Sequence, residues 1–348
     1  MSATIDRSGW KRVRLGNVLQ VCHGKCQHAI ESKTGKYPIL ATSGEIGRTD
    51  SYLYDGPSVL IGRKGTIDKP QYIDSPFWTI DTLFYTKIAE DYNPKFLYYL
   101  CLTIDWASMN EASGVPSLSA NRIESLEVTI PDVDEQDKIA NAITSIDTHI
   151  SALQALIAKY EAIKKATVNL LLEPKAGWLT STMGESFDLS RGVVISKNEI
   201  ERHPGIYPVY SSQSVNDGIL GLIDSYRYDG EYITWTTDGA NAGTIFYRHG
   251  KFNCTNVCGI AKVHTQEICP AFVALMIAQY AKSYVSYVGN PKLMSNVFAQ
   301  IPFSYPSTSE QRKIAEKIIA LDNALADYKA QLEKARQLKA GMMSYFFG

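Results

Sequence analysis

The sequence predicts an α/β (α+β) fold of two pseudo-repeated modules, separated by two long helices that form an antiparallel coiled coil. The segment EQDKIA at 135–140 returns as EQRKIA at 310–315. Each copy opens a stretch with apolar residues 3.5 positions apart on average, which is typical of a coiled-coil helix. Short β-branched and aromatic runs bounded by turn residues precede each copy, and these are typical of strands. The chain therefore repeats one unit, a module followed by a helix.

The repeat extends well beyond these six residues. In the same register, GVPSLSANRIESLEVTIP aligns without gaps on GNPKLMSNVFAQIPFSYP, with five identities: Gly114 and Gly289, Pro116 and Pro291, Leu118 and Leu293, Asn121 and Asn296, Pro131 and Pro306. Weaker matches lie upstream: Trp10 to Gly16 with Trp178 to Gly184, Tyr37-Pro38 with Tyr207-Pro208, and YLYDG (52–56) with YRYDG (226–230). We expect a first module over 1–133, a central helical spacer over 134–173, a second module over 174–306 and a C-terminal helical spacer over 307–348.

Each long helix carries a narrow apolar seam. The predicted seam residues are Ile139, Ile143, Ile146, Ile150, Leu153, Ile157, Tyr160, Ile314, Ile318, Leu321, Leu325, Tyr328 and Leu332. A helix of about 38 residues is about 57 Å long, too long for one module to cover. The simplest solution pairs the two helices antiparallel within the chain, which would place the modules at opposite ends. The alternatives are that each helix packs on its own module or pairs between chains.

Local signals set the expected elements. Asp134 with Asp137, and Ser307 or Ser309 before Glu310, are the expected caps of the two long helices. Strands are expected at 58–62, 82–88, 232–237 and 259–263, and helices that open on a proline at 94–104 and 270–285.

Composition and charge restrict the class of protein. There are 35 basic and 36 acidic residues, and 45% of the chain is apolar. A protein that binds nucleic acid alone usually has a basic excess. If this chain binds nucleic acid, then either its positive groups are clustered in the fold or partner subunits supply much of the phosphate contact. The N-terminus has no apolar signal region and no run reaches about 18 apolar residues, which predicts a cytoplasmic protein without a membrane partner. Six irregularly spaced cysteines predict no disulfide framework.

The sequence offers no catalytic motif. It has no phosphate-binding G-x-x-x-x-G-K-[ST] loop, no G-x-G-x-x-G fingerprint and no Asn/Asp-Pro-Pro-Tyr/Phe stretch. The pairs Cys22/Cys26 and Cys254/Cys258 lie at non-equivalent places in the two copies, so we interpret them as core or loop cysteines. We predict no metal, no cofactor and no enzymatic activity of the chain itself.

Polar loops at matching places are the candidate binding site. GRKGTIDKPQ (62–71) and TDGANAGTIF (237–246) follow equivalent strands but differ in side chains; 41–47 with 210–218 and 114–117 with 289–292 make two further pairs. Basic side chains suit guanine or phosphate, while Asp and Asn suit cytosine or adenine edges. The candidate DNA-binding residues are Thr42, Ser43, Arg63, Lys64, Ser117, Ser211, Ser212, Gln213, Thr237, Asp238, Asn241, Asn290 and Lys292. The alternative is that these loops are solvated tight turns.

Over its whole length the chain resembles the DNA-specificity subunits of type I restriction-modification systems. The resemblance rests on W-x5-G at Trp10 and Trp178, the Tyr-Pro pairs, the G-x-P-x-L-x-x-N segments and the Pro-x3-Glu-Gln-x-x-Ile-Ala helix starts. It implies two target recognition domains, each reading one half of a bipartite site in double-stranded DNA, and helices that fix the gap. It also implies methyltransferase (modification) subunits docked on the helices and an endonuclease/translocase (restriction) subunit joined through the complex.

Two other interpretations stay open. The modules could belong to another multisubunit assembly, type IIB-like or methylation-only. The chain could instead be a coiled-coil scaffold that does not touch DNA.

Overall fold

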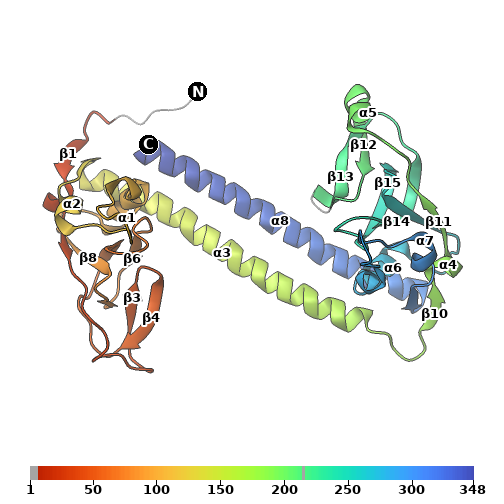
Figure 1. The fold of residues 1–348 in the computed structure, drawn as a ribbon, viewed down its shortest axis with the longest axis horizontal. Coiled ribbons are helices and arrows are strands. Elements are labelled where there is room, and N and C mark those ends of the chain that lie inside the picture. The colour runs from red at the N-terminus through yellow and green to blue at the C-terminus, as the bar shows by residue number, and fades with distance from the viewer. Residues whose placement is uncertain (1–6, 214–215) are drawn as a thin grey trace. The chain divides into compact units, whose positions relative to one another are not determined.

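A computed structural model describes residues 7–213 and 216–348. The chain divides into two compact units, Met1–Leu156 with Tyr328–Gly348 and Ile157–Asp327. Each unit contains one α/β module and part of two long helices, α3 (Val133–Leu172) and α8 (Thr308–Phe347) (Figure 1). The predicted class, mixed helix and sheet with two similar modules and two long helices, is confirmed.

The first module contains three small sheets. Its strands and helices are β1 Lys11–Arg14, β2 Leu19–Cys22, β3 Tyr37–Ala41, β4 Gly44–Thr49, β5 Ser58–Gly62, β6 Gln71–Ile73, β7 Trp78–Thr79, β8 Leu83–Ile88, α1 Pro94–Thr103, α2 Ala120–Glu124 and β9 Glu127–Ile130. The strand orders are β2-β8-β5-β6, β4-β3-β7 and β1-β9.

The second module contains two sheets. Its elements are β10 Leu179–Thr182, α4 Met183–Ser186, β11 Phe187–Arg191, α5 Lys197–Arg202, β12 Pro204–Tyr210, β13 Ile219–Ile223, β14 Tyr228–Thr236, β15 Ile245–Cys254, β16 Cys258–Val263, α6 Pro270–Ile277, α7 Ser295–Phe298 and β17 Pro302–Tyr305. The orders are β11-β16-β14-β15-β12-β13 and β10-β17. The order β11-β16-β14-β15 corresponds to β2-β8-β5-β6 of the first module, so the two modules share one topology.

At one equivalent pair of core positions, the larger side chain lies on opposite strands in the two modules. Ile61 on β5 lies opposite Phe84 on β8, whereas Trp235 on β14 lies opposite Gly259 on β16. A Cβ added at Gly259 would stand 2.1 Å from the Trp235 ring. Because interiors are close-packed, the large ring on one strand requires the missing side chain on the other. Sequence identity is lost here while the topology is kept.

A buried glutamine explains the repeated EQ motif in the first module. Gln136 is 1% exposed. Its Oε1 accepts the backbone N–H of Asn93, and its Nε2 donates to the carbonyl of Pro131 at 2.9 Å. Asn93 caps α1, since its side chain accepts the N–H of Phe96. The glutamine therefore ties the start of α3 to the start of α1.

The second module repeats this arrangement. Gln311 is 0% exposed, and its Oε1 accepts the N–H of Cys269 at 2.8 Å, directly before α6. Its Nε2 donates to the carbonyls of Glu267 and Pro306, both at 2.9 Å. The motif is common to the two copies because it joins the long helix to the module.

Ion pairs in each unit indicate that the long helices run antiparallel. In the first unit Lys339 of α8 pairs with Asp147 of α3 at 2.6 Å. In the second, Lys164 of α3 pairs with Asp322 of α8. Within the second unit the chain also advances toward the end of α3 as it returns toward the start of α8, because Val168 and Leu172 pack in one buried cluster with Ile314 and Ile318. All thirteen predicted seam residues are buried or half-buried; coiled-coil packing along the helices stays a prediction.

The end of α8 packs on the first module. Met342, Met343, Phe346 and Phe347 lie against its core, and the rings of Phe96 and Phe347 are 5.4 Å apart. The last turns of α8 thus complete a module that the sequence places far upstream.

Some local predictions need correction. The cap of α3 is Asp132, not Asp134: its Oδ1 accepts the N–H of Glu135 at 3.0 Å, and the helix begins at Val133. Ser307 caps α8 as expected. The helix expected over 270–285 ends at Ile277, and its chain turns so that the Tyr280 hydroxyl donates to the Pro302 carbonyl. The other expected strands and helices are found within a few residues of their predicted bounds.

Candidate DNA interface

In the first module the predicted loops meet. The N–H of Gly65 donates to the Pro116 carbonyl at 2.9 Å, and the N–H of Leu118 donates to the Arg63 carbonyl at 3.0 Å. Lys64 and Ser117 form the isolated β-bridge between these bonds. The backbone of this site is therefore fixed by a short ladder that joins the two loops.

The third loop of the first module reaches the same place. Thr42 follows β3, and its Oγ1 lies 3.8 Å from where a Cβ on Gly65 would stand. Ser43 is exposed at the turn between β3 and β4. Three segments distant in sequence thus present polar side chains together.

The second module repeats the ladder. The N–H of Gly239 donates to the Pro291 carbonyl at 2.9 Å, and the N–H of Leu293 donates to the Thr237 carbonyl at 2.9 Å. Asp238 and Lys292 form the bridge between them. The backbone arrangement is the same as in the first module although the side chains differ.

The third loop of the second module also joins the site. The Asn241 side chain donates to the Ser212 carbonyl at 3.2 Å. Ser211 lies in the same loop, where its N–H donates to the Gly218 carbonyl, and the Gln213 side chain donates to the Ile219 carbonyl. The matched segment 210–218 includes Ser214 and Val215, which lie outside the described residues.

A glycine is required at the same point of both ladders. Gly65 has φ +91° and Gly239 has φ +93°. These values lie in the region that residues with a Cβ rarely adopt. The shared Gly in otherwise different loops therefore allows this backbone conformation in both modules.

The side chains at the two ladders have different chemistry. In the first module Arg63, Lys64 and Ser117 line a depression of about 320 Å³ together with His23 and Asn121. Arg63 is half-buried, and its guanidinium donates to the Asp81 carbonyl at 3.0 Å, which leaves further donors on its fork. This surface suits an acceptor such as guanine or a phosphate.

In the second module an acidic side chain, that of Asp238, occupies the bridge position of the ladder. The Asp238 carboxylate accepts from the Thr237 hydroxyl at 2.6 Å and from Arg191 at 3.3 Å, and Lys292 lies 4.0 Å away. Thr237 itself is fully buried, so its hydroxyl supports Asp238 and does not face solvent. Asn290 and Lys292 are exposed.

A buried arginine that the sequence did not indicate supports the second site. Arg248 is 3% exposed and lies 3.6 Å above the Tyr210 ring and 4.2 Å from the Phe246 ring. It donates to the Asp217 carbonyl at 2.8 Å and pairs with the Asp217 carboxylate. Burial raises the pKa of Tyr210. This stack anchors the loop of Ser211 to Gln213, and an isolated Arg within a strand gives no sequence signal of that role.

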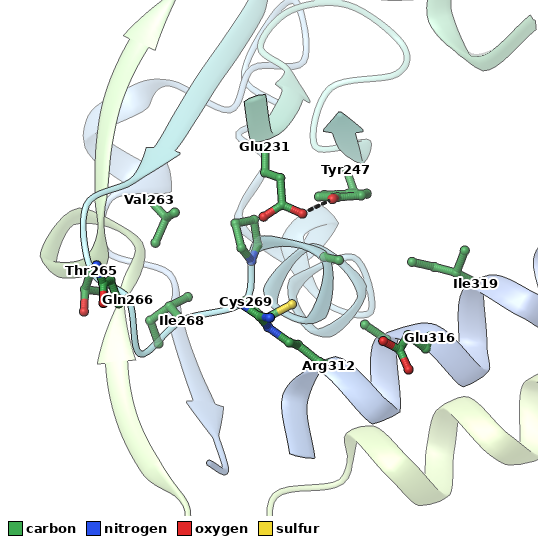
Figure 2. Close-up of a pocket in the computed structure, with 13 residues that line it drawn as sticks. Glu231, Tyr247, Val263, Thr265, Gln266, Ile268, Cys269, Arg312, Glu316 and Ile319 are labelled. Carbon is green, nitrogen blue, oxygen red and sulfur yellow. Dashed lines mark hydrogen bonds between the residues drawn. The ribbon is translucent and has the colours of Figure 1, made fainter. Parts of the chain in front are cut away.

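A separate groove lies at the start of α8. It has a volume of about 660 Å³, and its lining includes Arg312, Glu316 and Ile319 of that helix. Figure 2 shows Glu231 and Tyr247 hydrogen-bonded on the opposite side, with Cys269 near the helix. Its mixture of apolar and charged groups suits contact with another protein.

The described residues contain no candidate metal centre. Among residues 7–213 and 216–348, no group of three or more His, Cys, Asp or Glu side chains is placed to hold an ion. Cys254 and Cys258 are buried in the second module, Cys22 is half-buried and Cys26 is exposed.

Comparison with known proteins places the chain in a family. The profile of the type I restriction modification DNA specificity domain matches residues 7–162 and 175–335. The chain belongs to this family and is a type I specificity subunit for DNA target recognition. No helix of the described residues is long and apolar enough to cross a membrane.

Individual relatives agree with this assignment. One Mycoplasma pneumoniae protein, provisionally named a type I specificity subunit, is 30% identical over 244 residues, which are 68% of this chain and 91% of that protein. A second, provisionally named as the N-terminus of such a subunit, is 50% identical over 129 residues, 37% of this chain and 69% of that protein. The crystal structure of a type I restriction-modification S subunit from M. genitalium has a TM-score of 0.78 at 17% identity, covering 99% of this chain and 97% of that one, so the fold is shared.

Proposed function

We propose that each module is a target recognition domain that reads one half of a bipartite site in double-stranded DNA. The observation that carries this proposal is the pair of ladders, Lys64 with Ser117 and Asp238 with Lys292. One backbone arrangement with two sets of side chains is what two readers of different short sequences require. Base edges in the major groove are distinguished by donors and acceptors of this kind.

The two long helices, in this proposal, set the gap between the half-sites. Each half-site alone supplies few contacts, but linking two readers makes the second contact intramolecular and raises the effective affinity. Support comes from the ion pairs Lys339–Asp147 in the first unit and Lys164–Asp322 in the second, each of which joins α8 to α3. Spacing between the half-sites is then part of recognition.

Methyltransferase subunits dock on the helices, and a restriction subunit joins through them. The groove at Arg312, Glu316 and Ile319 is the contact surface that we assign to a methyltransferase subunit. The formal net charge of −1 fits this division, since partners would supply much of the phosphate contact. The chain itself contributes recognition and no catalysis, and it works with the chromosome in the cytoplasm.

Methylation sequencing tests the proposal. Genomic DNA is sequenced from cells that express the chain with its methyltransferase subunit and from cells that lack this chain alone. We expect a methylated motif of two short half-sites with a fixed gap that depends on the chain. A stable complex that forms without any methylated motif would instead favour a scaffold that does not read DNA.

A further inference from the structure

The two ladders place opposite charges at one equivalent backbone position. Lys64 bridges to Ser117 in the first module, and Asp238 bridges to Lys292 in the second. Each is followed by a glycine with φ near +90°, Gly65 at +91° and Gly239 at +93°. The Lys64 and Asp238 side chains therefore leave the backbone at equivalent points, one as a donor and one as an acceptor.

In the second module the acceptor is held in place. Oδ2 of Asp238 accepts from the Thr237 hydroxyl at 2.6 Å and from Arg191 Nη2 at 3.3 Å. Lys292 Nζ lies 4.0 Å from Oδ1, beyond the length of a strong hydrogen bond. The side chain of Asp238 is 27% exposed. One oxygen is thus fixed by the protein, and the other has capacity to accept from a ligand.

The first module has the opposite character. Lys64 is exposed at the edge of the depression of about 320 Å³, and no described residue that lines it is acidic. His23 takes the place of Arg191: the strand pairing of Cys22 with Tyr85 puts His23 beside Phe84, while Arg191 pairs with Gly259. The His23 ring contacts the Phe84 ring at 5.0 Å. Arg63 and Lys64 therefore have no acidic partner among the described residues that line the depression.

We propose that Lys64 and Asp238 are equivalent base-reading residues of opposite hydrogen-bonding polarity. Asp238 selects a base that presents an amino group in the major groove, cytosine N4 or adenine N6. Lys64 selects a base that presents acceptors there, of which guanine offers the strongest pair. Arg191 and Thr237 are positioning residues that aim the Asp238 carboxylate. This inference rests on the proposed function and adds the chemistry of one base pair in each half-site.

The test uses the complex of the full chain with its methyltransferase subunits. Binding is measured on duplexes that carry the methylated motif with every single base pair replaced in turn. Asp238→Asn keeps the shape of the side chain and replaces a carboxylate oxygen with an NH₂ group. We expect it to lower discrimination at one base pair of one half-site by about 5- to 150-fold, the value of one good base contact.

Lys64→Met is the matched variant in the first module. It should lower discrimination at one base pair of the other half-site and leave the Asp238-dependent base pair unchanged. Arg191→Lys keeps the charge but loses the planar fork, so it should weaken discrimination at the base pair that Asp238 reads. Combined with Asp238→Asn it should add no further loss, whereas a purely structural role would reduce binding to all sequences alike.

A second measurement does not depend on the variants. The unaltered complex is bound to duplexes in which purine replaces adenine or 2-pyrimidinone replaces cytosine, one position at a time, to remove single amino groups. One such position in one half-site should lose about 5- to 150-fold in affinity. The inference is overturned if no amino group matters, or if both charge-removing variants assemble and discriminate like the unaltered chain. A complex that recognises no bipartite site at all would instead refute the proposed function.

Discussion

Replacing Gln311 with alanine should loosen α6 and leave the first module intact. The change removes the acceptor of the Cys269 N–H and the donor to the carbonyls of Glu267 and Pro306. A buried group left without its partner costs about 1–3 kcal/mol, and carbonyls with a second lone pair cost less than an orphaned N–H. We therefore expect a local loss of about 2–4 kcal/mol.

Hydrogen exchange is the appropriate assay, because a chain of two compact units need not unfold in one step. A loss of about 2 kcal/mol corresponds to about 30-fold faster exchange of amides that open with the affected element. The expected change lies in peptides covering 270–277, while peptides covering 94–103 keep their protection.

Gln136→Ala provides the reciprocal experiment, since Gln136 accepts from Asn93 ahead of α1. It should speed hydrogen exchange in peptides covering 94–103 and leave exchange in peptides covering 270–277 unchanged. Glu310→Ala, at the exposed neighbour of Gln311, is the control and should change neither segment. Equal exchange in both helices after either glutamine substitution, or no change after both, would refute the proposed role of the motif.

Three further outcomes are expected. Arg248→Met removes the buried partner of Asp217 and should cost about 1–3 kcal/mol, seen as faster exchange over 216–223; unchanged exchange there would contradict the anchoring role. Glu316→Arg, in the groove, should weaken co-purification of the methyltransferase subunit about tenfold. Lys317→Glu on the same helix is the control and should not weaken it. If the two variants behave alike, the groove is not the contact surface of the methyltransferase subunit. Seven residues inserted at matched places in both long helices add about 10 Å and should shift the accepted gap by about three base pairs; an unchanged gap would contradict the spacing role.

The sequence predicts the architecture well because the two copies of the unit share several motifs and the same apolar spacing in their helices. The equal offset of EQDKIA and GVPSLSANRIESLEVTIP from their second copies identifies the repeat, and the 3.5-residue spacing identifies the long helices. The cap of α3 is mispredicted because Asp132 and Asp134 lie close together and both satisfy the cap pattern. Only the backbone geometry distinguishes them.

The candidate site is predicted in part. Matching positions in the repeat identify the loops, and the structure brings Lys64 to Ser117 and Asp238 to Lys292. Arg191 and Arg248 escape prediction because each acts through partners distant in sequence, 47 residues to Asp238 and 31 residues to Asp217. The first-module counterpart of Arg191 is His23, so the repeat does not mark this position.

The affinity of the assembled complex for DNA as a function of half-site spacing tests the central claim most directly. Duplexes would carry both half-sites with the gap varied one base pair at a time, beside duplexes with a single half-site. If two readers are joined by helices of fixed length, affinity peaks at one spacing, and both single half-sites bind much more weakly. Equal affinity at every spacing, or a single half-site that binds as tightly as the pair, would contradict the account.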